Sequence, residues 1–588
     1  MGLTGLLIYL LTGSLAFASG SVIHDASVQK PFVAPQHGIS QSSEQRLWDA
    51  PPADDSYDNQ IFFRLATLLQ HWPNTRYPSG ASIVPGTVPV GTTLYHGRSS
   101  AELPSRPDWL AFDPEHSIIF ARGSESRLFT FVATRPLYIL YFDGSSAAKL
   151  ASGAADTQNL LAWGRTGNQT FSEERALIDD LCKWGKPFGI DGYVRMELSF
   201  EIMYCDFYQG LEVVSSLHIL PTEGGHMPGG PPGKGPGGPP PPNLPDRPPN
   251  PPDFTSPPAP TVSRPSRPHF PEESRPPNWK GALLPMRERS IEAFQAGAWH
   301  HRPPGEVRVH LDVARLVSLY DPALRSGAQI RKGLEKVQHR GKGLSQEDIN
   351  TFRAWVIDSA RQTAPAMSGV DWQALTTVIM DRYSSRLEYL QFLLGPDHLS
   401  TNATAVVQNV RTQLMIMLMP DITPDTVPSN VTVTAPSSPA QYSQARRSEV
   451  QSNEWAKPIL DHCSSYLVSH LPQDKFTREE RTLYVGVSGT LHEICRVLSL
   501  LWSEAYDPLP AIQPIYLVDR WRVQVDELMK WLDWPMWNRC RPECGLDYIC
   551  FIPTWPIGVG RGPGGQGEED LTKVDWTPKC RSKSAESW

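Results

Sequence analysis

The 588-residue sequence contains few charged residues and no long basic run. Asp, Glu, Lys and Arg make up 20% of the chain, and the net charge is −8. Nucleic acid and anionic membrane surfaces are therefore not expected as partners. Beyond the first twenty residues, no apolar stretch reaches the ~20 residues that a helical span requires. After cleavage of a signal peptide, we expect no stable membrane span.

Three common catalytic motifs are also missing. The chain has no G-x-S-x-G, no H-E-x-x-H and no phosphate-binding P-loop, so serine hydrolase, zinc protease and NTPase activities lack support. No spacing of Asp and Glu singles out a pair of glycosidase carboxylates. His300, His301 and His310 could be metal ligands, but we interpret them as surface residues. No metal is therefore predicted.

The start of the chain resembles a secretory signal peptide. Residues 6–18 form an apolar run, and Ala16-Phe17-Ala18 gives the small-x-small pattern that signal peptidase accepts. The usual positive charges before the run are missing, which leaves an uncleaved anchor as the alternative. The run is short for a membrane span. We therefore predict a cleaved signal over residues 1–20 and a secreted, extracellular protein.

Eight cysteines follow the signal. An even number in a secreted chain predicts disulfides, but eight cysteines allow 105 pairings, so the connectivity is left open. Cys540, Cys544 and Cys550 are spaced somewhat like a zinc knuckle. No histidine follows at ligand distance, and an oxidising compartment favours disulfides. Sequons at Asn168, Asn402 and Asn430 predict a glycoprotein if those loops face solvent.

Changes in composition along the chain predict an α+β protein in several parts. Runs of β-branched and aromatic residues around a helical stripe indicate an N-terminal mixed α/β domain over residues 57–221. Residues 222–278 form a Pro/Gly-rich spacer, which we expect to be disordered. Helical periodicity then predicts a mainly helical, disulfide-bearing region over 279–557. Residues 558–588 are Gly-rich and polar, and are predicted to be a flexible tail.

Several helix boundaries can be placed from local signals. Apolar spacing predicts a helix over residues 57–72 that Pro73 ends. The strongest periodicity covers residues 371–394, and Gly395-Pro396 follows it. Thr477 and Glu480 form a capping box before another helix. A dense group of tryptophans between residues 502 and 555 could bind sugars, but we interpret it as helical core.

One pair of segments suggests a chemistry. LYHG places His96 at a strand end directly before Gly97, and residues 109–112 read as a second short strand, with a helix expected from Ser117. Downstream, FEIMY places Glu201 inside a hydrophobic strand. A lone carboxylate in apolar surroundings is costly. Glu201 is therefore expected at a strand rim, in an ion pair, or in a functional site.

These segments resemble ADP-ribosyltransferases of the diphtheria-toxin and poly-ADP-ribose polymerase type. That family has a strand with His-Gly, a strand with an aromatic residue, a short helix and a late strand of the form Glu-Tyr-Ile-Val-Tyr. The resemblance implies NAD as cofactor, with His96 and Gly97 holding it. It implies that Glu201 stabilises an oxocarbenium-like transition state. The middle motif lacks the family's tyrosine, and Phe112 and Phe120 are the aromatic residues near its position that could stack on nicotinamide.

A second resemblance covers more of the chain. Segments such as WLAFDPEHS, LYILYFDGSSAAK and FEIMYCDF resemble secreted proteins of filamentous fungi that have no assigned role. It implies a two-part fungal protein and no particular activity. Whether the chain is an enzyme therefore stays open. The alternative is a non-catalytic secreted binding or structural protein with an unknown protein or cell-surface partner.

The two hypotheses differ in where they place the side chains of His96 and Glu201. For NAD to bind as in the transferases, the side chains of His96 and Glu201 must face one cleft. If these side chains lie on opposite faces of a sheet, NAD cannot bridge them.

Overall fold

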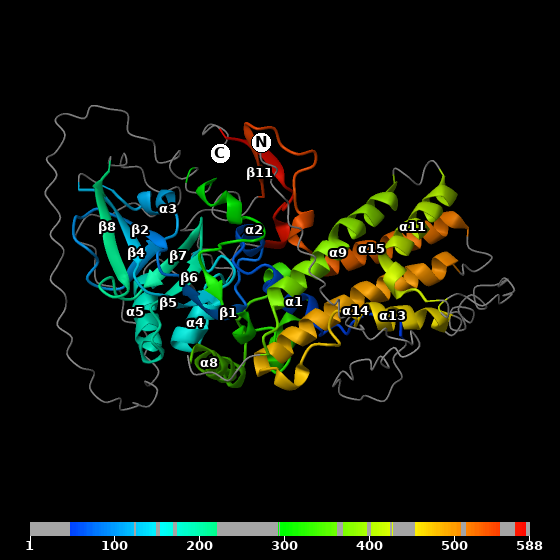
Figure 1. The fold of residues 1–588 in the computed structure, drawn as a ribbon, viewed down its shortest axis with the longest axis horizontal. Coiled ribbons are helices and arrows are strands. Elements are labelled where there is room, and N and C mark those ends of the chain that lie inside the picture. The colour runs from blue at the N-terminus through cyan, green and yellow to red at the C-terminus, as the bar shows by residue number, and fades with distance from the viewer. Residues whose placement is uncertain are drawn as a thin grey trace, which may run out of the picture. The chain divides into compact units, whose positions relative to one another are not determined.

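The computed structural model describes residues 48–122, 125–148, 153–167, 173–219, 292, 295–361, 368–396, 402–423, 426, 453–506, 513–552 and 571–583. They form a mixed sheet and a set of helices, which confirms the predicted α+β class (Figure 1). The predicted signal peptide and Pro/Gly-rich spacer, and the sequons at Asn168 and Asn430, lie outside the described residues.

The described residues contain one ten-stranded sheet. In chain order its strands are β1 (Ser82–Val88), β2 (Thr93–Arg98), β3 (Asp108–Ala111), β4 (Arg127–Ala133), β5 (Leu137–Phe142), β6 (Gly192–Met196), β7 (Phe200–Tyr204), β8 (Leu211–His218), β9 (His310–Leu311) and β10 (Val317–Ser318). The spatial order is β10-β1-β5-β6-β7-β3-β2-β4-β8, with β9 also paired to β1. Only β5 and β6 run parallel among these described pairs. Since β9 and β10 follow the spacer in sequence, both halves of the chain build this sheet.

The helices lie before, between and after the strands. They are α1 (Asp58–Ala66), α2 (His71–Arg76), α3 (Pro114–Ile118), α4 (Asp156–Trp163), α5 (Glu174–Gly185), α7 (Arg325–Arg331), α8 (Gln346–Ala360), α9 (Trp372–Leu393), α11 (Ala403–Leu418), α13 (Lys457–Cys463), α14 (Arg478–Tyr506) and α15 (Pro514–Leu532). The predicted single helix over residues 57–72 is wrong, because Leu69 adopts a left-handed φ of 58° that a continuing helix excludes. Pro73 lies inside the first turn of α2, where a missing N–H costs nothing.

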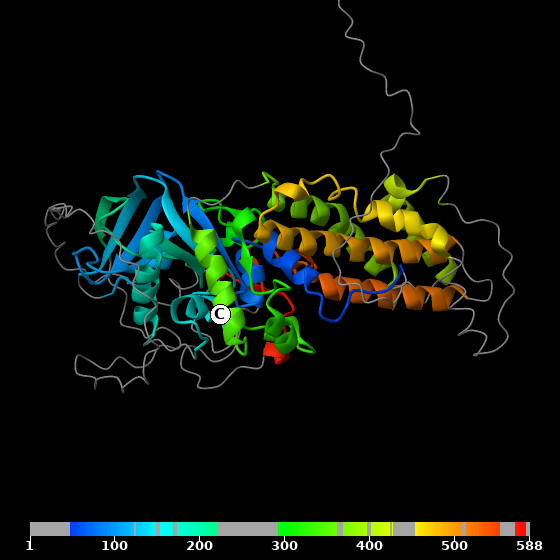
Figure 2. The ribbon, with the colours of Figure 1, turned by 90° about the horizontal axis from the view of Figure 1, so that it is seen from below.

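Helix α1 packs against α14, far from it in sequence (Figure 2). The two helices approach closely because α14 has Gly486 and Gly489 at the contact. A Cβ at Gly486 would overlap the Ile61 side chain, and one at Gly489 would overlap the Asp58 carboxylate. The predicted N-terminal segment and the predicted helical region therefore share a single hydrophobic core cluster.

The strongest helical predictions agree with the structure. Asp371 caps α9 by accepting a hydrogen bond from the Ala374 backbone N–H at 2.9 Å. Thr477 and Glu480 exchange the two hydrogen bonds of a capping box, at 3.1 and 3.0 Å. Trp502, Trp521 and Trp534 are buried in the core, as the core interpretation predicted.

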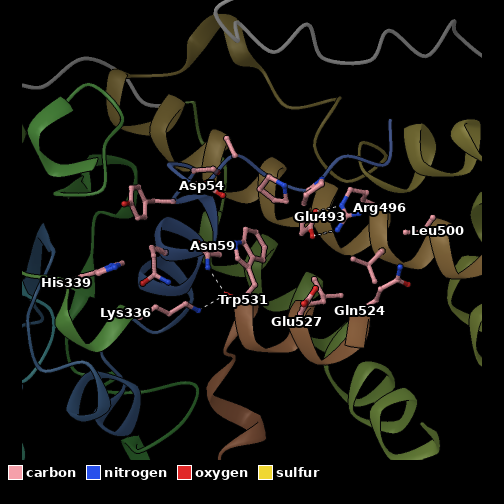
Figure 3. A pocket seen from close by; sticks show the side chains of 18 residues that line it. Asp54, Asn59, Lys336, His339, Glu493, Arg496, Leu500, Gln524, Glu527 and Trp531 are labelled. Atoms are coloured by element: carbon pink, nitrogen blue, oxygen red, sulfur yellow. Dashed lines mark hydrogen bonds and ion pairs between the residues drawn. The ribbon is translucent and has the colours of Figure 1, made fainter. Parts of the chain in front are cut away.

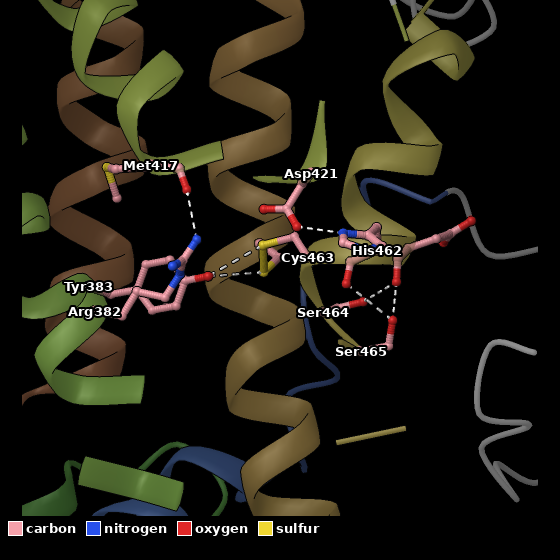
Figure 4. Close-up of a disulfide and its surroundings, with 10 residues drawn as sticks. Arg382, Tyr383, Met417, Asp421, His462, Cys463, Ser464 and Ser465 are labelled. Atoms are coloured by element: carbon pink, nitrogen blue, oxygen red, sulfur yellow. Dashed lines mark hydrogen bonds and ion pairs between the residues drawn. A yellow bond between two sulfur atoms is a disulfide. The ribbon is translucent and has the colours of Figure 1, made fainter. Parts of the chain in front are cut away.

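All eight cysteines form disulfides, which confirms that prediction. The pairs are Cys182–Cys205, Cys463–Cys495, Cys540–Cys550 and Cys544–Cys580. Cys463–Cys495 joins α13 to α14 (Figure 4). Cys540–Cys550 and Cys544–Cys580 brace a small sheet of β11 (Tyr548–Phe551) and β12 (Lys579–Ser582).

Part of the predicted flexible tail, residues 579–582, forms the strand β12 in the structure. Residues 579–582 pair with β11, and the disulfide from Cys544 holds Cys580 in place. Composition alone could not show that a Gly-rich segment ends in a tethered strand. Among the described residues, no helix combines the length and apolar character needed to cross a membrane.

Candidate functional site

The strand register shows where the two central candidates lie. Tyr95 on β2 pairs with Ala111 on β3, and Ala111 pairs with Glu201 on β7. Directly paired residues project their side chains from the same face of a sheet, and successive residues alternate. Tyr95, Ala111 and Glu201 therefore share one face. His96 follows Tyr95 directly and projects from the opposite face.

His96 lies in an aromatic environment on its own face. Its Nδ1 is 2.7 Å from the Trp109 carbonyl oxygen, and its ring meets Phe207 edge-on with centroids 5.4 Å apart. Burial lowers the pKa of the His96 imidazole. This environment favours a neutral histidine that is hydrogen-bonded to the backbone.

Glu201 lies in a buried ion-pair network, which we call the Arg195 cluster: Arg195, Glu201, Glu174 and His116. The Arg195 Nε donates to Glu201 Oε1 at 2.8 Å, and its Nη2 pairs with Glu174. His116 Nε2 lies 3.8 Å from Glu201 Oε2. Glu201 is 4% exposed and Arg195 is 0% exposed. Burial alone would lower the pKa of the Arg195 guanidinium, but the two carboxylates raise it above its usual value. Of the three positions expected for Glu201, the structure shows the ion pair.

The remaining candidates differ in their surroundings. Gly97 allows α3 to lie directly on β2, because a Cβ there would overlap the Ser117 carbonyl oxygen. Phe112 is fully buried, whereas Phe120 is 44% exposed and lies near His116.

The helix expected from Ser117 in fact begins at Pro114. Proline suits the first turn of a helix, since its φ is already helical and its missing N–H is not needed there. The residue before it, Asp113, carries a carboxylate that sequence reasoning did not single out.

Asp113 belongs to a second buried group, which we call the His300 cluster: Asp113, His300, Glu306 and Arg308. Arg308 Nη2 lies 3.0 Å from Asp113 Oδ1 and 2.6 Å from Glu306 Oε2. His300 Nε2 lies 3.6 Å from Asp113 Oδ2 and 4.0 Å from Glu306 Oε2. The interpretation of His300 as a surface residue is wrong, because its side chain is 0% exposed. His310, in contrast, is exposed and lies on β9.

A cavity of about 360 Å³ lies among α1, the short helix η4 (Lys336–Gln338), α14 and α15 (Figure 3). Three of its charged groups, Glu493, Arg496 and Lys336, have partners. Arg496 binds both oxygens of Glu493 at 2.6 and 2.7 Å, and Lys336 Nζ donates to the Trp531 carbonyl oxygen at 2.6 Å. Leu500 and other apolar residues complete the lining. A cavity of this size and mixed lining suits a small ligand with polar and apolar parts.

Lys336 also has an unusual charge state. Burial lowers the pKa of its ammonium group well below the usual value. Such a lysine can act as a nucleophile. Here its hydrogen bonds to the Lys530 and Trp531 carbonyls tie it to the C-terminal turn of α15, which favours a capping role.

His339, which also lines this cavity, predicts a loss of stability in acid. Burial and the nearby Arg331 lower the pKa of its imidazole to about 4, against about 6.5 in an unfolded chain. As the pH falls from about 6.5 to 4, the unfolded state takes up a proton that the folded state does not. The free energy of unfolding should therefore fall by about 3 kcal/mol over this window.

Urea unfolding at pH 7 and pH 4.5 measures this effect. His339→Gln should reduce the difference between the two values, while His310→Gln, on the exposed strand β9, should retain the wild-type difference. An unchanged difference in His339→Gln would show that this residue does not control the acid response.

Together these features define an α+β protein whose mixed sheet carries two buried ion-pair clusters. Residues 52–127 and 122–225 match the family model described as YPL277C N-terminal domain. The chain is 24% identical to "Uncharacterized protein YOR389W" of Saccharomyces cerevisiae, over 89% of this chain and 86% of that protein. It is 30% identical to "Uncharacterized protein YPL277C" of the same yeast, over 36% of this chain and 52% of that protein. No solved structure matches it.

These relatives confirm the predicted similarity to uncharacterised fungal proteins. Neither name states an activity. The function therefore has to be argued from the geometry.

Proposed function

We propose that this chain is a non-catalytic, secreted binding or structural protein. The observation that carries the proposal is the sheet register, which sets the His96 and Glu201 side chains on opposite faces. NAD cannot be held by both groups across the thickness of a sheet. The competing hypothesis, an NAD-dependent ADP-ribosyltransferase-like domain, requires both to face one cleft.

The environment of Glu201 further supports this proposal. A carboxylate that stabilises a developing positive charge must face the reacting sugar. Glu201 Oε1 instead accepts a hydrogen bond from Arg195, and Oε2 faces His116. With 4% of the residue exposed, little of it is available to a substrate.

Secretion is supported by the disulfides and by the signal-like start. Four disulfides among eight cysteines are typical of an oxidising compartment. Asn402 is exposed at the N-cap of α11, so its sequon is accessible for glycosylation. We further propose that the partner is a protein or cell-surface molecule, and that the cavity beside Trp531 holds a small part of it.

A nicotinamide-release assay on the purified chain tests the proposal. We expect no turnover of NAD by the wild type and none by Glu201→Gln, because Glu201 is paired with Arg195 and lies on the face of the sheet opposite His96. Glu212→Gln, at an exposed position on β8, is the matched control for loss of a strand glutamate.

The opposite result would be equally clear. If the wild type released nicotinamide, and Glu201→Gln lowered turnover by ~10² while Glu212→Gln did not, Glu201 would be acting as a preorganised catalytic group. The binding-protein proposal would then fail.

A further inference from the structure

The His300 cluster contains a set of donor atoms that the proposed function does not use. Asp113, His300 and Glu306 each offer one ligand atom, and the three atoms lie within 4.8 Å of one another. Zinc binds imidazole nitrogen and carboxylate oxygen at about 2.0–2.2 Å, so its tetrahedral ligand atoms lie roughly 3.3 Å apart. His300 Nε2 lies 3.6 Å from Asp113 Oδ2 and 4.0 Å from Glu306 Oε2, and both distances are close to that spacing.

The histidine is buried, and its contacts with the carboxylates are longer than ordinary hydrogen bonds. His300 is 0% exposed, its Nε2 lies 3.6 Å from Asp113 Oδ2, and its Nδ1 has no hydrogen-bond partner among the described residues. A buried polar group without a partner is costly, so it needs an explanation. An imidazolium would need acceptors for two N–H groups, whereas a neutral imidazole bound to a metal through Nε2 needs one only for Nδ1.

The charges in the cluster are also unequal. The carboxylates of Asp113 and Glu306 face one guanidinium, that of Arg308. Buried charge that is not balanced is strongly unfavourable. The two carboxylates and one guanidinium leave a net charge of −1, which a proton on His300 balances and a divalent cation more than offsets. The three ligand atoms lie within 4.8 Å of one another, and this spacing favours the cation.

The surrounding residues are arranged to support the three ligands. Arg308 donates to Glu306 Oε1 from its Nε at 2.8 Å and reaches Asp113 Oδ1, so the far oxygen of each carboxylate is held. It also contacts Glu306 Oε2, which lies on the His300 side. Ser199 Oγ donates to Asp113 Oδ2 at 2.8 Å. Partners of this kind orient the ligands of metal sites.

We propose that Asp113, His300 and Glu306 bind one divalent cation of the zinc class, through Asp113 Oδ2, His300 Nε2 and Glu306 Oε2. The donor set of one imidazole and two carboxylates suits Zn²⁺ and its spectroscopic substitute Co²⁺. The three residues are buried, so the ion would join the segment at residues 300–306 to the start of α3. This inference does not depend on the proposed binding function.

Metal titration of the untagged, disulfide-intact full chain tests the proposal. After treatment with a chelator, the wild type should bind one Zn²⁺ per chain in calorimetry, and Co²⁺ should give the visible absorption of a tetrahedral site. His300→Gln should weaken Zn²⁺ binding by ~100-fold or more, since loss of a supporting partner alone costs 10–100-fold. The control His310→Gln should bind as the wild type does.

Folding of each variant is checked by circular dichroism. If His300→Gln fails to fold, Asp113→Asn supplies the same comparison, because its amide oxygen can still accept from Arg308 and its amide N–H can donate to Ser199 Oγ. Two results overturn the proposal. One is a wild type that binds neither ion, which would assign the missing charge to a proton. The other is a Zn²⁺ affinity of His300→Gln or Asp113→Asn that equals that of the wild type, which would place the ion elsewhere.

Discussion

Replacing Arg195 with methionine is expected to lower the free energy of unfolding by about 3–5 kcal/mol. Arg195 is fully buried and pairs with both Glu174 and Glu201. Methionine fills a similar volume but leaves two carboxylates buried without a cation. Urea unfolding followed by circular dichroism at neutral pH measures the loss.

Arg135→Met is the matched control. Arg135 also binds a carboxylate with two nitrogens, at 2.7 and 2.6 Å from Asp191, but its side chain is 45% exposed. Exposed pairs contribute about 1 kcal/mol or less. If both variants lost the same small amount of stability, the Arg195 cluster would contribute no more to the fold than an exposed ion pair does.

Removing the Cys463–Cys495 disulfide should also have a large effect. Cys463→Ala combined with Cys495→Ala should lower the free energy of unfolding by about 4 kcal/mol, because this bond closes a loop with a sequence separation of 32. Both sulfurs are buried beside the Tyr383 hydroxyl, at 3.6 and 4.0 Å (Figure 4). The loss of packing adds to the loss of the cross-link.

The pair Cys540–Cys550 provides the comparison. Its sequence separation is 10, so the same double alanine change should lower the free energy of unfolding by about 3 kcal/mol from the lost loop closure alone. Non-reducing mass spectrometry confirms that the other bonds remain. A larger loss for Cys540–Cys550 than for Cys463–Cys495 would contradict the ranking by loop length and burial.

Local signals in the sequence predicted the regular elements well. The capping pair Thr477 and Glu480 and the periodicity before Gly395 act within a few residues, so they can be read without the fold. The helix over residues 57–72 was predicted wrongly for the same reason. Nothing local shows that Leu69 takes a left-handed conformation, since its backbone is held by the Tyr141 hydroxyl and the Glu306 N–H, both distant in sequence.

The candidate site was harder to predict because it depends on register. LYHG and FEIMY identify two strands correctly, but a strand motif does not show which face its side chains occupy relative to a third strand. One usable signal was overlooked. Arg195 and Glu201 are opposite charges inside two apolar strands joined by a short turn, and that pattern predicts a buried ion pair.

The His300 cluster shows a different limit. Asp113 and His300 are separated by almost two hundred residues and by the Pro/Gly-rich spacer. A histidine doublet in a polar segment is usually exposed, and here only tertiary packing buries it. Neither composition nor spacing could bring it beside the start of α3.

A double-mutant cycle between Arg195 and Glu201 tests the central claim, that Glu201 is a structural partner of Arg195. The free energies of unfolding are measured for the wild type, Arg195→Met, Glu201→Leu and the double variant. Arg195→Met leaves the Glu174 and Glu201 carboxylates without their cation, Glu201→Leu leaves Arg195 with Glu174 alone, and the double change leaves only Glu174 unpaired. We predict a double variant less destabilised than the sum of the single changes by about 2 kcal/mol. Single effects that add to within about 0.5 kcal/mol would show no coupling and would contradict the claim.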